Sequence, residues 1–541
     1  MSSQLSPYPI RDLEKREIPS ETASGNTDDL GLPPPEEGVS AVYEAKSRLI
    51  NEHFENEVGF GRYQMQLFML TGLGWMADNV WMQAAFIILP QIRNEMNPSR
   101  VEYTTLALYV GLILGASMWG ILADIIGRRL SFNITLLIAG VFGVAAGSAN
   151  DFTTLCALIA CCGFGIGGNL PVDGAIFLEH VPRSHQWLLT LLSVWWAIGQ
   201  LFASLVAWPL ISNFSCASAE GCVKADNQGW RYTFYTLGGA TIMMWVMRYT
   251  IFDLQESSKF YIAKGQDEKA LKVLEHIARK NGREITLTLD RLRAVAGEQT
   301  GVAKAKVTTL QIVKEWFSSF NLSHVTPLFS TKRLAINTSM TIVIWGLLGL
   351  GYPLFNGFIT LYLSTQVPGS TPSTYQTYRD YTIISIMGIP GTILACLAVD
   401  YSRKNQGSKF ALGGRKLTMA VATALNAVFL FLFTISKTQA AVLAFSCASG
   451  LAVNAMNGVL YAYTPEVFPA PHRGTGDAIC AAFNRITGIL APVIKIATTN
   501  VDGSASGGTA NGPIFVSATL FLVASVLMVL LPIETAGKAA L

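Results

Sequence analysis

Long apolar runs recur along the whole chain, and they constrain its fold more than any other feature. An α-helix of about 20 apolar residues crosses the roughly 30 Å hydrocarbon core of a bilayer. Only 14% of the 541 residues are charged, whereas soluble proteins carry roughly 25%. The runs lack the alternation that a membrane β-barrel requires. The sequence therefore predicts an all-α membrane protein. We expect its twelve transmembrane helices at residues 67–89, 104–122, 130–148, 153–177, 187–211, 232–252, 337–362, 381–399, 417–435, 439–462, 475–497 and 514–532.

A polar stretch separates the first six runs from the last six, so the helices are expected to form two bundles. The predicted parts are a cytosolic, largely disordered tail at 1–60, a six-helix bundle at 61–252, a cytosolic central loop with short helices at 253–336, a second six-helix bundle at 337–532 and a short cytosolic tail at 533–541.

Two polar segments have the residue spacing of amphipathic helices. AVYEAKSRLINEHFENEV at 41–58 could form one just before the first membrane helix. In QDEKALKVLEHIARKNG of the central loop, Leu271, Leu274 and Ile277 share one helical face, and Gly282 is the expected stop. We expect the second helix at the cytosolic face of the membrane, within reach of anionic lipid head groups.

Lys and Arg are concentrated on one side of the predicted spans, and short cytosolic loops carry such an excess. The residues on that side are Arg128, Arg129, Arg183, Arg403, Lys404, Lys409, Arg415, Lys416 and Arg473, with Lys259, Lys264, Lys332 and Arg333 from the central loop. Both termini are therefore predicted to be cytosolic, in a multi-pass protein of the plasma membrane. A formal net charge of +3 gives no reason to expect a nucleic-acid partner.

The stretch at 211–231 then faces the exterior or a lumen. Cys216 and Cys222 flank a polar part of it, and an oxidising compartment allows them to form a disulfide. Asn213 begins the sequence Asn-Phe-Ser, which is a glycosylation acceptor on that side of the membrane.

Three phrases recur at matched positions in the two halves, which indicates a duplicated six-helix unit. The pairs are GILADIIGRR at 120–129 with DYSR and GGRK within 400–416, EHVP at 179–182 with YTPEVFPAPHRG at 463–474, and QES at 255–257 with PIETAGK at 532–538.

These phrases are typical of the major facilitator superfamily, and the chain resembles its sugar porters. Within that group it is most similar to the synaptic-vesicle-glycoprotein-related carriers and the proton symporters for nicotinate and other organic acids. GFGRYQMQLFMLTGLGWMADNVW at 59–81, GFGIGG at 163–168 and the phrase at 463–474 carry the resemblance. The resemblance implies alternating access, in which the two halves rock about a central site.

The resemblance also implies a charged gate on the cytosolic side, although the basic residues alone could reflect topology. The gate residues it assigns are Gly120, Asp124, Gly127, Arg128, Arg129, Asp173, Glu179, Asp400, Arg415, Glu466 and Arg473. Asp173 is expected within reach of the Arg128 loop. The family usually has Arg at the positions of Ile159 and Gln186, so the gate in the first half is expected to be looser or rebuilt.

Asp78 lies near the middle of the first predicted membrane helix. A charge in hydrocarbon is costly, so an ionisable residue there marks a functional site by default. Burial favours the neutral form of a carboxyl group, so Asp78 could take up and release a proton as the site changes exposure. The alternative is a static hydrogen bond to a neighbouring helix.

Arg485 lies at a similar depth in the eleventh predicted helix. It could recognise an anionic solute, pair with Asp78 or brace the second half. The resemblance to sugar porters, which line their cavity from these helices, implies that polar residues of the seventh and tenth helices complete the substrate site, although each could equally make an ordinary interhelical hydrogen bond. They are Tyr352, Asn356, Asn454, Asn457 and Tyr461.

GFGIGG formally matches a dinucleotide fingerprint, but it lies inside a predicted membrane helix rather than after a strand. The sequence shows no metalloprotease, paired CxxC or nucleotide-phosphate motif, so we predict no enzyme, cofactor or metal. The prediction is a monomeric, proton-coupled carrier of a small solute, with an organic anion favoured over a sugar because of Arg485. A membrane sensor or scaffold and an uncoupled facilitator are the alternatives.

Overall fold

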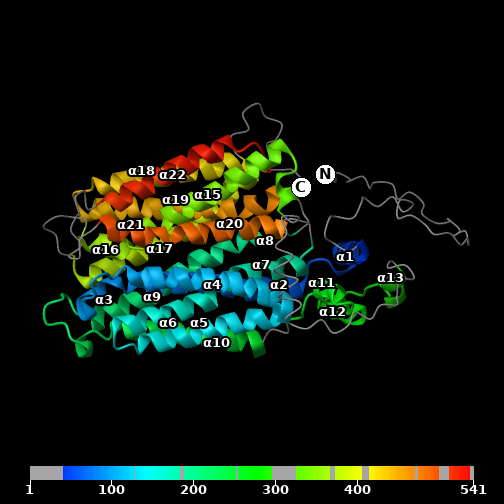
Figure 1. Ribbon diagram of the computed structural model, residues 1–541, viewed down its shortest axis with the longest axis horizontal. Helices are drawn as coiled ribbons and strands as arrows, with labels where there is room; N and C mark the ends of the chain where they lie inside the picture. Colours follow the sequence, from blue (N-terminus) through cyan, green and yellow to red (C-terminus); the bar gives the residue numbers. More distant parts are fainter. Residues whose placement is uncertain are drawn as a thin grey trace, which may run out of the picture.

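The computed structural model describes residues 41–126, 128–182, 185, 188–250, 254–294, 325–365, 372–404, 414–468, 473–498 and 511–535. Within these residues the chain is helical, and Figure 1 shows the long helices running side by side along the molecule. The first half consists of α2 (Arg62–Ile87), α3 (Leu89–Met96), α4 (Tyr103–Ile126), α5 (Arg128–Gly147), α6 (Phe152–Gly167), α7 (Asn169–His180), α8 (Leu188–Leu191), α9 (Ser193–Phe214) and α10 (Gly229–Thr250). The second half consists of α15 (Lys332–Asn356), α16 (Ile359–Thr365), α17 (Thr374–Lys404), α18 (Arg415–Thr434), α19 (Gln439–Val467), α20 (Arg473–Gly488), α21 (Leu490–Thr498) and α22 (Gly512–Leu530).

Nine helical segments of the described residues are long and apolar enough to cross a membrane. With α2, α4 and α10 they complete the two predicted sets of six. Two of the spans are each built from two consecutive helices. The fourth changes from α6 to α7 at Gly168, just before Pro171, and the eleventh changes from α20 to α21 near Pro492. Proline lacks the backbone donor and clashes with the preceding turn, which explains why breaks occur near it.

Helix ends follow local capping rules. The side chains of Asp151, Thr331 and Thr438 accept hydrogen bonds from backbone N–H groups in the first turns of α6, α15 and α19. Such caps satisfy donors that a helix N-terminus leaves unpaired.

The GFGIGG phrase serves helix packing. A Cβ atom on Gly115 of α4 would lie 2.2 Å from the carbonyl oxygen of Phe164 in α6, and one on Gly167 of α6 would lie 2.4 Å from the carbonyl oxygen of Leu112. The two backbones are therefore in contact, as small residues permit in membrane helices.

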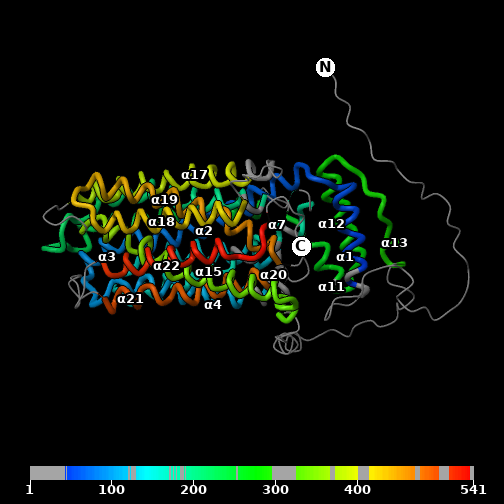
Figure 2. Tube along the Cα trace, turned by 90° about the horizontal axis from the view of Figure 1, so that it is seen from above, coloured from blue at the N-terminus to red at the C-terminus, as the bar shows by residue number. Residues whose placement is uncertain are grey.

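Four short helices gather at one end of the long bundle (Figure 2). They are α1 (Ala41–His53), α11 (Ser258–Ala263), α12 (Asp267–Lys280) and α13 (Leu289–Ala294). We call this the α1 end and the opposite one the α3 end. The amphipathic helix expected at 41–58 is present as α1 and the π-helical turn η2 (Phe54–Val58).

The α1 helix packs on the central-loop helices through both apolar and charged contacts. Ile50 is buried in the same cluster as Leu274 and Ile277 of α12. Lys46 Nζ lies 2.5 Å from Asp267 Oδ2, and both side chains are largely buried. The predicted stop at Gly282 is a left-handed residue with φ of 70°, which is a common way for a helix to end.

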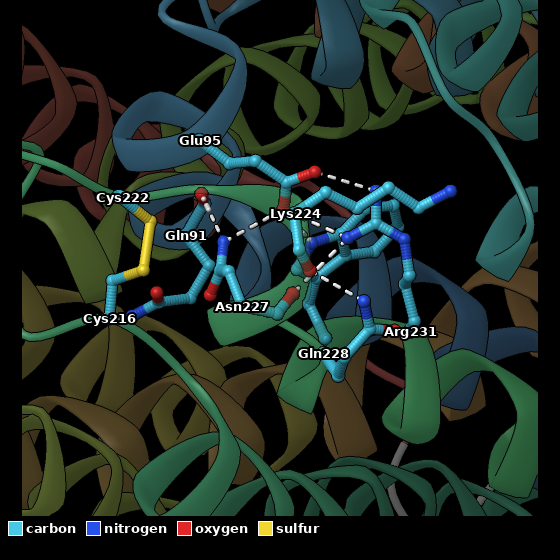
Figure 3. Close-up of a disulfide and its surroundings, with 9 residues drawn as sticks. Gln91, Glu95, Cys216, Cys222, Lys224, Asn227, Gln228 and Arg231 are labelled. Atoms are coloured by element: carbon cyan, nitrogen blue, oxygen red, sulfur yellow. Dashed lines mark hydrogen bonds and ion pairs between the residues drawn. A yellow bond between two sulfur atoms is a disulfide. The ribbon is translucent and has the colours of Figure 1, made fainter.

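A polar cluster lies at the α3 end of the first half (Figure 3). Glu95 Oε1 lies 2.6 Å from Arg231 Nη2. Trp230 Nε1 and Asn227 Nδ2 each donate to Glu95 Oε2 over 3.0 Å. Although burial raises the pKa of Glu95, its hydrogen bonds from Arg231 and Trp230 bring that pKa below its ordinary value. The cluster ties α3 to α10.

The same end carries the disulfide between Cys216 and Cys222, which lies in the connection between α9 and α10. The side chain of nearby Asn213 is exposed in the last turn of α9, and its amide donates to the carbonyl oxygen of Pro209 over 2.9 Å. Glycosylation of Asn213 stays a prediction.

Candidate functional site

Asp78 lies in the middle part of α2 and is only 1% exposed. Its Oδ1 atom is buried and has no hydrogen-bond partner among the described residues. An unpaired polar atom in an apolar interior costs free energy, so such atoms in native structures call for an explanation.

Arg485 of α20 faces the same region from the second half and is 9% exposed. Asp78 and Arg485 interact electrostatically, but no direct ion pair joins them. Tyr109 of α4 and Tyr461 of α19 also lie within electrostatic range of Arg485. The centre of the molecule therefore contains two buried opposite charges, one from each half.

Three tryptophan side chains surround Tyr461. Its ring centroid lies 5.5 Å from that of Trp75, 6.2 Å from that of Trp196 and 5.1 Å from that of Trp345. Trp75 and Trp196 also contact each other, in an edge-on arrangement at 6.5 Å. Because Trp75 is one turn from Asp78 on α2, this aromatic cluster lies beside the buried charges.

A polar chain continues from Asp78 along α2 toward the second half. Asn79 Nδ2 donates to the carbonyl oxygen of Trp196 over 2.7 Å. Gln83 Nε2 donates to Asn79 Oδ1 over 2.9 Å and to the hydroxyl oxygen of Tyr352 over 3.3 Å. The hydroxyl of Tyr381 in α17 donates to Gln83 Oε1. Asn79, Gln83 and Tyr381 were not predicted from the sequence, although the phrase ADNVWMQ shows Asn79 and Gln83 four residues apart, directly after Asp78.

Further hydrogen bonds join the two halves toward the α3 end. The Thr360 hydroxyl donates to the carbonyl oxygen of Phe86, and the Tyr378 hydroxyl donates to that of Ile87, each over 2.9 Å. With the Gln83–Tyr381 bond, these contacts hold α2 against α16 and α17. We call these three bonds the α3-end seal.

The other predicted substrate residues make local contacts. Asn454 Nδ2 donates to the carbonyl oxygen of Gly450 in its own helix over 2.9 Å. Asn356 Nδ2 lies 3.5 Å from the carbonyl oxygen of Tyr352. Asn457 is half-buried in α19, in the same stretch of helix as Tyr461. Of the predicted set, Tyr352 and Tyr461 lie in the network around α2, while the asparagines show no contact with Asp78 or Arg485 in the described residues.

Asp173 of α7 pairs with a residue that the sequence analysis did not consider. Its Oδ2 atom lies 3.3 Å from Arg248 Nη2, and both side chains are 0% exposed. Arg248 also donates to the carbonyl oxygen of Phe132, over 2.8 Å. The Arg128 side chain lies outside the described residues, so the expected proximity of Asp173 to the Arg128 loop stays a prediction. The pair joins α7 to α10 in the interior of the first half.

Two carboxylates cap corresponding helices of the two halves. The backbone N–H of Arg129 in α5 donates to Glu256 Oε2 over 3.1 Å. The backbone N–H of Arg415 in α18 donates to Glu534 Oε1 over 3.0 Å. Glu256 and Glu534 belong to the third pair of repeated phrases, which was the signal for this role. Negative charge is favourable at a helix N-terminus.

The Arg415 side chain also contacts Glu466 of α19, so two predicted gate residues meet in the second half. Glu179 is half-buried near the end of α7. The Gly127 position, the surroundings of Gly120 and the side chains of Asp124, Arg128, Asp400 and Arg473 lie outside the described residues.

Two six-helix halves that meet around buried charges define a multi-pass membrane transporter. A family model described as Major Facilitator Superfamily matches residues 67–410. The MFS siderochrome iron transporter 1 of Ceriporiopsis subvermispora is 43% identical, over 93% of this chain and 93% of its own length. The synaptic vesicle 2-related protein of Xenopus laevis is 26% identical, over 89% of this chain and 80% of its own length. Among solved structures, the proton:xylose symporter XylE of E. coli has a TM-score of 0.63 at 17% identity, over 88% of this chain and 98% of its own.

The chain belongs to the major facilitator superfamily, which is a family of transporters and not of enzymes. The predicted family and the predicted all-α fold of two six-helix halves are thereby confirmed. The likeness to XylE shows a shared fold alone.

Proposed function

We propose that the chain is a secondary active transporter that moves a small organic anion by alternating access, together with a proton bound by Asp78. The observation that supports this most directly is the electrostatic interaction of Asp78 with Arg485, two buried side chains from opposite halves that form no direct ion pair. A buried charge is tolerated only when another charge compensates it.

In the proposed cycle the Asp78 carboxylate and the anionic solute alternate as the group that compensates the charge of Arg485. While Asp78 is ionised, its charge offsets that of Arg485. Once Asp78 takes up a proton, the planar fork of Arg485 becomes available for a carboxylate of the solute. Proton and anion therefore bind together and leave together, which is symport. We assign the transported proton to Asp78 Oδ1, which has no hydrogen-bond partner among the described residues.

The α3-end seal supports a state that is closed on one side of the membrane. Its three bonds connect α2 with α16 and α17 beyond Asp78. We propose that the α1 end is cytosolic, as the distribution of Lys and Arg predicts, and that the structure is closed to the exterior. Opening toward the exterior would break the seal and reorient the polar chain that begins beside Asp78.

Uptake into proteoliposomes tests the proposal. The panel consists of monocarboxylates, hexoses and an iron-loaded siderochrome, the last because of the name of one relative. We expect saturable uptake of a carboxylate, accelerated when the external buffer is more acidic than the lumen. Arg485→Lys keeps the charge but loses the fork, so it should raise the KM for that carboxylate. Hexose uptake that is unaffected by this substitution would overturn the proposal.

A further inference from the structure

Two short segments interlock at the α1 end, one leading into α2 and one following α12. They are residues 57–64 and 281–286, and we call them the α2–α12 joint. Asn281 is its centre. Its Oδ1 atom accepts from the backbone N–H of Tyr63 over 3.0 Å, and its Nδ2 atom donates to Gln64 Oε1 over 2.8 Å. The first turn of α2 is therefore fixed to the cytosolic helices.

The joint explains the glycines of the GFG phrase that precedes α2. A Cβ atom on Gly59 would lie 2.2 Å from Arg283 Nη1, and one on Gly61 would lie 2.4 Å from Asn281 Cγ. Gly59 also has a left-handed φ of 57°, which other residues rarely adopt. The backbone at these positions must stay bare for the two segments to fit together.

Thr286 is attached to the joint through a single carboxylate. Its backbone N–H donates to Glu57 Oε2 over 2.8 Å, and its hydroxyl donates to Glu57 Oε1. Arg283 Nη1 donates to the carbonyl oxygen of the same glutamate over 3.3 Å. Burial raises the pKa of Glu57, but the hydrogen bonds from Thr286 and the contact with His53 together bring that pKa below its ordinary value. Glu57 is therefore ionised at neutral pH.

Thr286 also lies in a segment that an enzyme can reach. Residues 283–288 have no regular secondary structure, and the side chains of Arg283 and Thr286 are exposed. Arg283 is three residues before Thr286. Protein kinases select substrates by the pattern of charges around the acceptor hydroxyl. An exposed, irregular segment with an arginine at this distance fits a kinase whose cleft is acidic.

We propose that Thr286 is a phosphorylation site for such a kinase, and that its phosphate opens the α2–α12 joint. The Thr286 oxygen attacks the γ-phosphorus of ATP, the bond to ADP breaks, and the hydroxyl proton passes to the base of the kinase. The reaction requires the α1 end to face the cytosol, where ATP is present. It does not depend on which solute is carried or on proton coupling.

The phosphate would act on the joint through charge. It carries about −1.5 to −2 charges at neutral pH, and next to an acidic residue it disrupts contacts by repulsion. Modified Thr286 can no longer donate its hydroxyl to Glu57, and the new charge faces an ionised carboxylate. Because the joint fixes the first turn of α2, and α2 carries Asp78, its opening would loosen the helix at the centre of the transport site.

The test uses the full chain in detergent micelles, with ATP and the catalytic subunit of a kinase that prefers arginine three residues before its target. Mass spectrometry should find a phosphate on Thr286. That phosphate should be absent in Thr286→Ala, at least tenfold lower in Arg283→Gln and unchanged in the matched control Thr288→Ala. Hydrogen exchange of residues 41–58 should become at least tenfold faster after phosphorylation of the wild type.

Two results would overturn the proposal. One is a full chain that stays unmodified at Thr286 while a peptide of residues 280–291 is phosphorylated by the same kinase. The other is a phosphate on Thr286 that leaves hydrogen exchange at 41–58 as it was. Neither readout requires transport, so failure here is distinguishable from failure of the proposed proton symport.

Discussion

Asp78 of α2 and Arg485 of α20 come from opposite halves of the chain, and they interact electrostatically in the interior without forming an ion pair. Each partly compensates the buried charge of the other. We propose that a proton on Asp78 removes this compensation and leaves Arg485 free for another anion.

The Asp173–Arg248 pair should depend on the absence of a side chain at Gly74. A Cβ atom there would lie 1.7 Å from Asp173 Oδ2 and 2.2 Å from Arg248 Nη2. We expect Gly74→Ala to lower the free energy of unfolding by about 3–5 kcal/mol, the usual cost of breaking a buried ion pair. Thermal unfolding in detergent measures this. Gly174→Ala is the matched control, because a Cβ atom at Gly174 meets nothing within 4 Å.

The Glu95 cluster should make stability depend on pH. Burial raises the pKa of Glu95, but its hydrogen bonds outweigh this and bring the pKa below the ordinary value of 4.5. A lowered native pKa gives stability that is present above the ordinary value and is lost as the pH falls through the native one. Glu95→Gln should cost about 2–3 kcal/mol at pH 7. The difference in Tm from the wild type should shrink below pH 4.5, whereas exposed Asp226→Asn should have little effect at any pH.

The two helix caps should behave alike. Glu256 and Glu534 accept hydrogen bonds from the first turns of α5 and α18. Replacing either with alanine should destabilise the protein by about 1 kcal/mol, as for other caps. Thermal unfolding of the two single variants and the double variant would show whether the effects are similar and additive. Effects confined to one half would contradict the symmetry inferred from the repeated phrases.

The α3-end seal should control access from that end. Tyr381→Phe and Tyr378→Phe each remove one hydrogen bond from the closed state, worth about 1 kcal/mol. The reporter is Ala84→Cys, a buried position of α2, in a background without the six free cysteines. A membrane-impermeant maleimide applied from the α3 end should label it roughly fivefold faster in each variant. Tyr375→Phe on the same helix serves as a control, since its side chain is 52% exposed.

The spans, the repeat and the amphipathic helices were accessible from sequence because each depends on local periodicity. The predicted run at 130–148, for example, is α5 at Arg128–Gly147. The partner of Asp173 was not accessible. Arg248 follows the apolar phrase MMWVM and reads as a helix-end residue that extends toward the head groups, whereas the structure buries it against α7. Pairing between distant helices depends on their relative rotation, which a single sequence does not encode in a readable pattern.

Only part of the central site could be predicted, because contacts between distant helices are not visible in the sequence. Asp78 and Arg485 were identified because a charge in an apolar run is conspicuous. Gln83 and Tyr381 are ordinary polar residues in membrane helices, and their bond is visible only once α2 and α17 are placed side by side. The asparagines of α19 were carried over from family resemblance by region, and Asn454 instead bonds within its own helix.

The proton-binding role of Asp78 can be tested by comparing two transport modes in proteoliposomes. The wild type should accumulate its carboxylate when an inward proton gradient is imposed, and it should exchange labelled for unlabelled solute without a gradient. Asp78→Asn should abolish accumulation but retain exchange, whereas Asp380→Asn, which replaces another buried acid, should retain both. Gradient-driven accumulation by Asp78→Asn at the wild-type level would contradict the account.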